Sequence, residues 1–388
     1  MKWEYVALGD LYEVHNGLSK GGRFFGDGFP FLSFSTVFNK WFLPQELPDL
    51  VQSTDKEQQS YSIRRGDVFV TRTSETMDEL GMSSVALKDY PHATYNGFTK
   101  RLRPINSERI LPEFIGYYLR TPFFRAGFAA FSTMTTRASL RNEDLLSMKV
   151  PVPDIPTQKR IANILSAYDN LIENDQKQIK LLEEAAQRLY KEWFVDLRFP
   201  GHENTKITDG IPEGWRRGAL ADVATFKRGK TITKEQTNPG VVPVVAGGLE
   251  PAYFHDTFNT GAPVITVSGS GANAGFTRMY HTKVWASDCS YVDSVATENL
   301  AWVYCFLKEN NTKIETMQKG AAQPHVYAKD INALEAVIPN DKQMKRFQAI
   351  AEPMFARIGT LETQKARLRE ACNCLLPKLM NGEIEVEK

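Results

Sequence analysis

Two short polar segments in corresponding places of the chain carry the side chains best suited to contacting DNA bases. Their candidate residues are Thr135, Thr136 and Arg137 in the first segment, and Lys319, Gln323 and His325 in the second. In the major groove, Arg can bridge two acceptors of guanine and Gln can bridge adenine. A solvated surface loop explains the same residues, and on the segments alone it is the preferred interpretation.

Other motifs with possible chemistry lack the context that their chemistry needs. The run Phe24 to Gly28 matches the letters of a methyltransferase cofactor loop, which requires a strand before it and a helix after it. Two glycines and Arg23 precede this run and Pro30 follows it, which favours a turn. No tetrapeptide resembling Asn-Pro-Pro-Tyr supplies the catalytic half of such an enzyme.

Nuclease and nucleotide-binding patterns also fail. Asp154 and Asp175 resemble a metal-dependent nuclease pair. A straight helix rises roughly 1.5 Å per residue, so the helix between them holds the two carboxylates too far apart to share a cation. The glycine-rich run 268–275 lacks the lysine of a phosphate loop, so both a ligand-facing loop and a wide turn remain open for it. The six histidines have no metal-ligand spacing. We therefore expect no catalytic residue, no metal and no cofactor.

Composition points to a neutral protein of two or three cores. The chain of 388 residues includes 47 basic and 46 acidic side chains, so a nucleic-acid surface would have to be a local patch. The four cysteines fit neither a zinc site nor a disulfide framework, which favours reduced thiols and a cytoplasmic location. The start of the chain has no signal-peptide core, and no apolar run is long enough to span a membrane.

Two stretches have apolar residues at alternating steps of three and four, which is typical of a coiled-coil seam. The first seam runs from Ile161 to Trp193 and the second from Phe347 to Leu379, in the same phase at an offset of 186 in residue number. Each stretch read alone fits an ordinary amphipathic helix on its own core. The shared phase favours two helices that pack on each other, with a kink possible at Pro353.

An internal repeat organises the rest of the chain. Trp3, Ala7, Leu8, Asp10 and Gly17 recur, at an offset of 212 in residue number, as Trp215, Ala219, Leu220, Asp222 and Gly229. Farther along, Asp144 matches Asp330 and Pro153 matches Pro339, at an offset of 186. The two copies therefore share a frame and differ in loop length.

The repeat sets the expected domains. They are a globular domain at 1–155, a coiled-coil helix at 156–199, a linker at 200–214, a second globular domain at 215–340 and a second helix at 341–388. Strands are expected near 67–71, 148–152, 263–267 and 334–338, and helices near 112–119 and 299–307. The fold class is α/β (α+β), with two similar domains separated by a pair of long antiparallel helices and related by an internal pseudo-twofold repeat.

Local signatures add a resemblance to a known family. They are residues 193–201, beginning Trp-Phe-Val-Asp, residues 210–222 around Gly-Trp, the helix openings at Gln158 and Gln343, and residues 375–384. With the repeat, they make nearly the whole chain resemble the specificity subunits of type I restriction-modification systems. One departure is the run 340–343, where the family has a Pro-rich, acidic lead-in.

The resemblance implies a non-enzymatic role. Each globular domain would be a target-recognition domain for one half of a split double-stranded DNA site. The helices would dock two copies of a methyltransferase subunit, and a restriction and motor subunit would join them. Two alternatives stay open: a methyltransferase fused to a DNA reader, and a coiled-coil scaffold that binds only proteins.

The resemblance and the repeat together favour the DNA interpretation of the polar segments. The expected DNA-binding residues are Lys20, Arg23, Thr135, Thr136, Arg137, Lys230, Lys319, Gln323 and His325. For the helices, an antiparallel register with Ile161 opposite Leu379 also sets Asp175 opposite Lys365. Such a polar pair would fix the register more than it would add stability. The alternative is that both side chains reach solvent.

Overall fold

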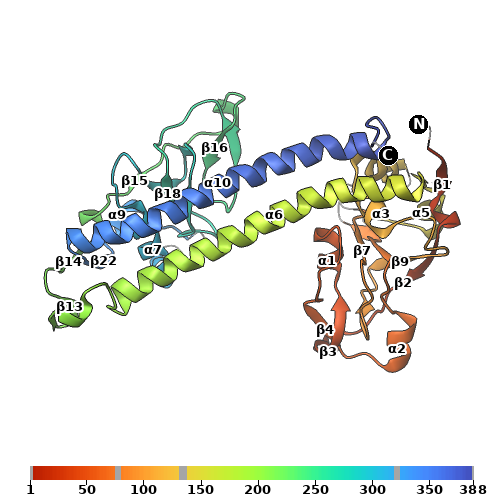
Figure 1. Ribbon diagram of the computed structural model, residues 1–388, viewed down its shortest axis with the longest axis horizontal. Coiled ribbons are helices and arrows are strands. Elements are labelled where there is room, and N and C mark those ends of the chain that lie inside the picture. Colours follow the sequence, from red (N-terminus) through yellow and green to blue (C-terminus); the bar gives the residue numbers. More distant parts are fainter. Residues whose placement is uncertain (1–2, 75–79, 131–137, 319–323, 387–388) are drawn as a thin grey trace. The chain divides into compact units, whose positions relative to one another are not determined.

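The computed structural model describes residues 3–74, 80–130, 138–318 and 324–386. The chain forms two compact units, one of Met1–Ile172 with Arg367–Lys388 and the other of Glu173–Ala366. Two long helices, α6 (Ile155–Tyr190) and α10 (Asp341–Met380), each contribute one half to each unit. Figure 1 shows the sheets of each unit beside these helices.

The first unit contains three main sheets. Its two-stranded antiparallel sheet pairs β1 (Tyr5–Ala7) with β11 (Lys149–Pro151). Its four-stranded sheet has the order β2 (Tyr12–Asn16), β9 (Thr99–Pro104), β5 (Val68–Thr71) and β7 (Ser83–Val85). Its three-stranded sheet has the order β4 (Asp49–Val51), β3 (Phe25–Leu32) and β8 (Thr94–Tyr95), with β8 parallel to β3.

Short elements complete this unit. The strands β6 (Thr73–Ser74) and β10 (Ala138–Ser139) pair antiparallel. The helices are α1 (Phe34–Asn39), α2 (Asp55–Ser60), α3 (Pro112–Tyr118), α4 (Pro122–Ala126) and α5 (Asn142–Ser147).

The second unit repeats the strand order of the three main sheets. The pair β14 (Arg216–Ala219) and β22 (Glu335–Ile338) is antiparallel. The four-stranded order is β15 (Lys227–Arg228), β21 (Cys289–Asp293), β18 (Val264–Ser268) and β19 (Thr277–Tyr280). The three-stranded order is β17 (Tyr253–His255), β16 (Val242–Val245) and β20 (Trp285–Ala286), with β20 parallel to β16. The mixed fold and its internal repeat, both expected from the sequence, are confirmed.

The described residues of the second unit also form three short α-helices and a hairpin. The helices are α7 (Leu300–Glu309), α8 (Asn311–Thr316) and α9 (Ala328–Asn332). A hairpin of β12 (Ile207–Thr208) and β13 (Ile211–Pro212) lies in the segment that joins α6 to β14. Its turn residues, Asp209 and Gly210, both have positive φ, at 51° and 74°. A two-residue type I′ turn requires this conformation at both positions.

Strand and helix predictions from the sequence hold closely. The expected strands correspond to β5, β11, β18 and β22, and the expected helices to α3 and α7. Among the described residues, β11 pairs with β1 alone, which agrees with an edge strand that contains Pro151.

The long helices differ from the expectation mainly at their ends. Helix α6 opens where Asp154 Oδ1 accepts a hydrogen bond from the Thr157 amide at 2.7 Å. Its α-helical part gives way to a π-helical turn at Lys191–Val195. Helix α10 runs without a break through Pro353. It ends at Met380 rather than near 388, because Gly382, with φ of 76°, reverses the backbone.

Each half of the helix pair is part of the core of its unit. In the first unit Ile161 and Leu165 of α6 lie in one apolar cluster with Leu376 and Leu379 of α10 and with the sheet residue Leu102. In the second unit the same kind of cluster joins α6 and α10 to the sheet, through Ile179, Ala186, Phe347, Leu361 and Val292. Within each unit, the start of one helix therefore packs on the end of the other, which is the antiparallel arrangement expected.

The repeated glycines mark a close backbone approach that recurs in both units. A Cβ atom on Gly17 would lie 2.1 Å from the carbonyl oxygen of Asn96, and one on Gly229 would lie 2.3 Å from that of Ser287. The following amides, of Leu18 and Lys230, donate to the strand that this approach reaches, β8 or β20. These positions require glycine for space, not for an unusual φ.

We predict that Gly17→Ala lowers the free energy of unfolding of the first unit by about 1–3 kcal/mol, because backbone must move to admit the methyl group. Gly22→Ala is the matched control, since a Cβ there meets nothing within 4 Å. Thermal unfolding of both variants checks this, and equal melting temperatures would contradict it.

Candidate nucleic-acid interface

The register of the four-stranded sheets places a surface cleft at the same point of each repeat. Asn16 pairs with Lys100 in the first unit, and Arg228 pairs with Ser290 in the second. Leu140 and Val326, at the offset of 186, each donate a backbone hydrogen bond to the residue after the strand β5 or β18, namely Arg72 or Gly269. These matched bonds make the two clefts structurally equivalent.

The cleft of the first unit, here called the basic cleft, has a volume of about 460 Å³. Its lining residues are Asn16, Arg72, Lys100, Leu140, Arg141, Asn142 and Glu143. Lys100 lies on β9 with only 6% of its surface exposed, and its Nζ donates to Oδ1 of Asn142 at the start of α5. Burial, and then the nearby charge of Arg72, lower the pKa of Lys100.

The cleft of the second unit, here called the mixed cleft, is smaller, at about 180 Å³. Its lining residues are Arg228, Gly269, Asp288, Cys289, Ser290, His325, Val326, Tyr327 and Ala328. Asp288 accepts a hydrogen bond at Oδ2 from Ser270 Oγ. The His325 ring is stacked on the Tyr327 ring, with centroids 5.9 Å apart.

Equivalent positions in the two clefts carry different chemistry. The position of Arg72 is Gly269, that of Lys100 is Ser290, and that of Arg141 is Tyr327. The mixed cleft also has the carboxylate of Asp288, on the residue before β21. The first unit therefore has two cations, Arg72 and Lys100, at positions where the second has Gly269 and Ser290. A carboxylate lines each cleft, Glu143 in the first and Asp288 in the second.

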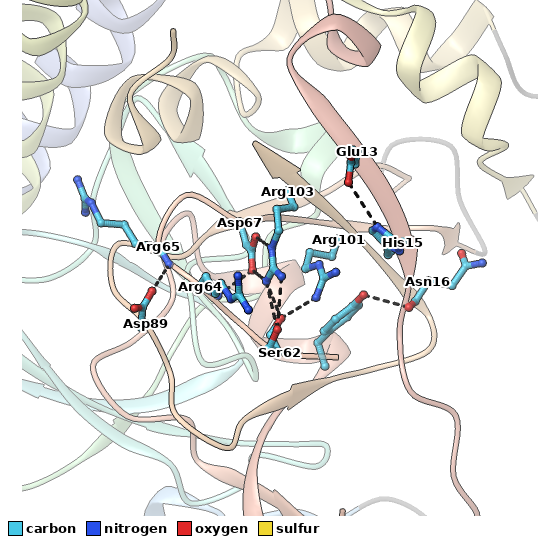
Figure 2. A network of polar contacts seen from close by, with 11 residues as sticks. Glu13, His15, Asn16, Ser62, Arg64, Arg65, Asp67, Asp89, Arg101 and Arg103 are labelled. Carbon is cyan, nitrogen blue, oxygen red and sulfur yellow. Dashed lines mark hydrogen bonds and ion pairs between the residues drawn. The ribbon is translucent and has the colours of Figure 1, made fainter. Parts of the chain in front are cut away.

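Beside the basic cleft, a buried network holds the sheet and its arginines in place. Figure 2 shows Arg103 bound to Asp67, with Nε–Oδ1 of 2.8 Å and Nη2–Oδ2 of 2.6 Å. Arg101 Nη1 donates to the Ser62 carbonyl at 2.7 Å in the same view. The hydrogen bonds to Asp67 raise the pKa of Arg103, whereas burial lowers the pKa of Arg101. The side chains of these two arginines therefore form hydrogen bonds that stabilise the fold.

Tyr95 connects this network to the basic cleft, because its ring lies 5.3 Å from the Arg101 guanidinium. The Tyr95 hydroxyl donates to the carbonyl of Asn16 at 3.0 Å, which fixes the end of β2 where Asn16 lines the basic cleft. A carboxylate also caps the turn before β5, because Asp67 Oδ2 accepts from the Arg64 amide at 2.7 Å. In the second unit Asp293 Oδ2, at the end of β21, accepts from the Gly261 amide at 2.6 Å.

Five of the expected DNA-binding residues lie outside the described residues: Thr135, Thr136, Arg137, Lys319 and Gln323. The described residues that follow those segments, Leu140 and His325, line the two clefts. His325 also forms an isolated antiparallel bridge with Ser270.

The candidates in the early loops have local partners. Lys20 Nζ lies 2.8 Å from Glu57 Oε2 and donates to the Gln52 carbonyl, and its bond to Glu57 lowers the pKa of that carboxyl. Arg23 lies over the Phe24 ring at 4.8 Å, and Lys230 lies 5.9 Å from the Trp285 ring. Both are cation–π contacts. The ion pair holds Lys20 on the protein surface, so its charge is largely balanced there.

Sequence reasoning did not identify Arg72, Lys100 or Arg141. Lys100 belongs to a short basic run with Arg101 and Arg103. Nothing in that run distinguishes Lys100 from Arg101, whose side chain is hydrogen-bonded within the unit. Only the strand register shows that Lys100 opens into the cleft while Arg101 supports the turn at Ser62.

The run Phe24 to Gly28 is not a cofactor loop. Phe24 ends a 3-10 turn, and the remaining residues belong to β3, where the register with β4 shifts between Phe25 and Phe29. Gly26 and Gly28 have φ of 99° and 105°. A bulged strand accommodates such positive φ at glycine. The turn expected for this run is therefore wrong from Phe25 onward, where the residues belong to a strand, and a bulged strand is also not the loop between strand and helix that a methyltransferase cofactor site needs.

The polar positions of the helix pair lie at one level of the second unit. Asp175 is 2% exposed, and its Oδ1 accepts from Gln364 Nε2 at 3.5 Å. Lys365 Nζ donates to Gln176 Oε1 at 2.5 Å. Residues 175–176 therefore face residues 364–365. The expected partners Asp175 and Lys365 lie at the same level of the helix pair, but each is hydrogen-bonded to the neighbour of the other, Gln364 and Gln176.

Two absences bear on the class of site. Across the described part of the chain, no helix is both long and apolar enough to cross a bilayer. In those same ranges, His, Cys, Asp and Glu side chains form no group of three or more that could hold a metal ion.

Fold and clefts together define an internally repeated binding protein. Similarity to known proteins gives the family: the type I restriction modification DNA specificity domain matches residues 1–184 and 212–370. The chain belongs to this family, whose description names DNA specificity and not catalysis.

Relatives span the full length. The MjaIX type I restriction enzyme specificity subunit of Methanocaldococcus jannaschii is 24% identical, covering 100% of this chain and 94% of that protein. The HindI specificity subunit of Haemophilus influenzae is 21% identical, covering 98% and 99%. The crystal structure of a type I restriction-modification S subunit from M. genitalium has the same fold, with a TM-score of 0.64 at 15% identity over 100% of this chain and 97% of that one.

The helix register predicts coupling between positions 175 and 365. Asp175→Leu and Lys365→Leu should each destabilise the second unit, and the double variant should recover much of the loss, with a coupling of about 0.5–3 kcal/mol. Denaturant unfolding measures it. Lys313→Leu, an exposed change on α8, is the control and should be additive with Asp175→Leu. Additive effects for 175 and 365 would show that the register is wrong.

Proposed function

We propose that this chain is the DNA specificity subunit of a type I restriction-modification complex. Residues 1–155 and 215–340 would each recognise one half of a two-part DNA site. Residues 156–199 and 341–388 would dock the methyltransferase subunits, two copies in all, and a restriction subunit would complete the complex. The specificity chain itself supplies recognition and no catalytic group.

The observation that carries this proposal is the pair of equivalent clefts with different chemistry. A protein that binds one small molecule needs one site, whereas a reader of two different half-sites needs one frame used twice with different side chains. The basic cleft and the mixed cleft have this relationship. Membership of the DNA specificity family supports the same conclusion.

The charge distribution is compatible with DNA recognition through a small group of cations rather than through a basic surface. The chain carries a net charge of +1, so attraction to phosphates over the whole surface is weak. Cations gathered in one cleft can still contact DNA, and affinity would then depend on partners that add contacts. Testing the chain together with its methyltransferase subunit is therefore appropriate.

The two alternatives differ in what they bind. A methyltransferase fused to a reader would bind S-adenosylmethionine without a partner, and the bulged strand at Gly26 and Gly28 removes its one candidate loop. A protein-only scaffold would enrich no DNA sequence.

The direct test is selection from random-sequence duplexes by the purified chain in complex with its methyltransferase subunit. We expect a motif in two parts separated by a gap of fixed length. A selection that enriches no motif would contradict the proposal, and so would a single continuous motif.

Replacement of Arg137 tests one expected base contact. Arg137→Ala should weaken binding by about 1–3 kcal/mol and relax one position of the selected motif. Arg109→Ala is the control, because Arg109 is a half-exposed arginine of the same unit in a 4.0 Å ion pair with Glu4. Selection with each variant decides it, and an unchanged motif for Arg137→Ala would reject the assignment.

A further inference from the structure

The basic cleft holds its most buried cation in a fixed direction. Lys100 is 6% exposed, and its Nζ donates to Oδ1 of Asn142. A lysine ammonium has three N–H donors, so two remain. Arg72 adds guanidinium donors to the same cleft. The one carboxylate among the described lining residues, Glu143, is an exposed side chain of α5. A partly desolvated ammonium with free donors is suited to a ligand that presents acceptors.

We propose that the basic cleft is the subsite that selects guanine in the half-site read by the first unit, with Lys100 contacting the O6 and N7 acceptors. This inference rests on the proposed function and names the residues that give it specificity. Arg141, exposed at the rim, contacts a phosphate, and Asn142 positions the Lys100 amine.

Burial separates the two roles within one cleft. A phosphate contact carries no sequence information and suits an exposed side chain such as Arg141. A buried donor discriminates, because a base without the matching acceptor leaves the Lys100 charge unsatisfied. In the major groove, guanine presents two neighbouring acceptors, whereas adenine places an amino donor beside its N7.

The mixed cleft supplies the contrast. With Ser290 and Gly269 in place of Lys100 and Arg72, it lacks the cations at those positions and has Arg228 where the basic cleft has Asn16. Its carboxylate, Asp288, belongs to the residue before β21, whereas Glu143 of the basic cleft belongs to α5. A carboxylate accepts from the exocyclic amine of cytosine, and it would repel the acceptor edge of guanine. The second unit therefore reads a different base at the equivalent position, and the two half-sites differ there.

The test uses the full chain in complex with its methyltransferase subunit, first by selection from random duplexes and then by affinity at several salt concentrations. Lys100→Met keeps the volume of the side chain and removes its charge. One guanine of one half-site should become degenerate, and affinity for the best site should fall about 5- to 150-fold with an unchanged salt slope. Arg141→Ala should weaken all sequences alike and reduce the salt slope by about one.

Two further measurements keep the result independent of folding. Asn142→Ala changes an exposed residue and should relax the same guanine as Lys100→Met. Replacing that guanine by 7-deazaguanine should weaken the unmodified protein and leave the Lys100→Met variant unaffected. Melting temperatures confirm that each variant is folded.

Three results would overturn the inference. The first is a Lys100→Met motif identical to that of the unmodified protein, and the second is uniform weakening with a reduced salt slope, which would make Lys100 a phosphate contact. Either leaves the proposed function standing. If the unmodified complex enriches no motif at all, the proposed function fails and this subsite fails with it.

Discussion

Burial of the apolar seam between α6 and α10 is the interaction on which each unit depends. The seam residues are not a separate layer, because Leu165 and Leu376 share one cluster with the first sheet, and Leu361 shares another with the second sheet. Full burial of one such side chain contributes about 1.5–3 kcal/mol. A buried glutamine near the start of each long helix binds it to another segment of the chain. Gln158 accepts from the Leu111 amide at 2.8 Å, and Gln343 donates to the Pro200 carbonyl at 2.9 Å. Each globular fold is therefore completed by its halves of the two helices.

The repeat keeps its backbone constraints and changes the side chains that line the two clefts. Gly17 and Gly229 are retained because any side chain would collide with a carbonyl group. Lys100 and Ser290 occupy equivalent strand positions in the two units, and there the backbone does not require a particular side chain. Recognition can vary at those positions without loss of the fold, which is what a protein with two different half-sites requires.

Much of the fold could be predicted from the sequence, because it depends on local periodicity and on a repeat. The heptad phase of Ile161 to Trp193 predicted the helices, and the recurrence of Trp3 as Trp215 predicted two similar domains. The clefts could not be predicted in this way. The basic cleft arises where β9 meets the start of α5, and only the tertiary fold brings Lys100 beside Asn142, 42 residues away along the chain. The expected bound at 388 lies beyond the end of α10 at Met380, which is next to the last seam residue, Leu379, and is followed by the positive φ of Gly382.

The most direct test of the account is a structure of the chain with its methyltransferase subunit on a duplex that carries the selected site. The account predicts that the basic cleft and the mixed cleft each face the major groove of a different half-site, with the Lys100 amine within hydrogen-bond distance of guanine. A complex in which either cleft faces solvent or a protein subunit, with the bases contacted elsewhere, would contradict it.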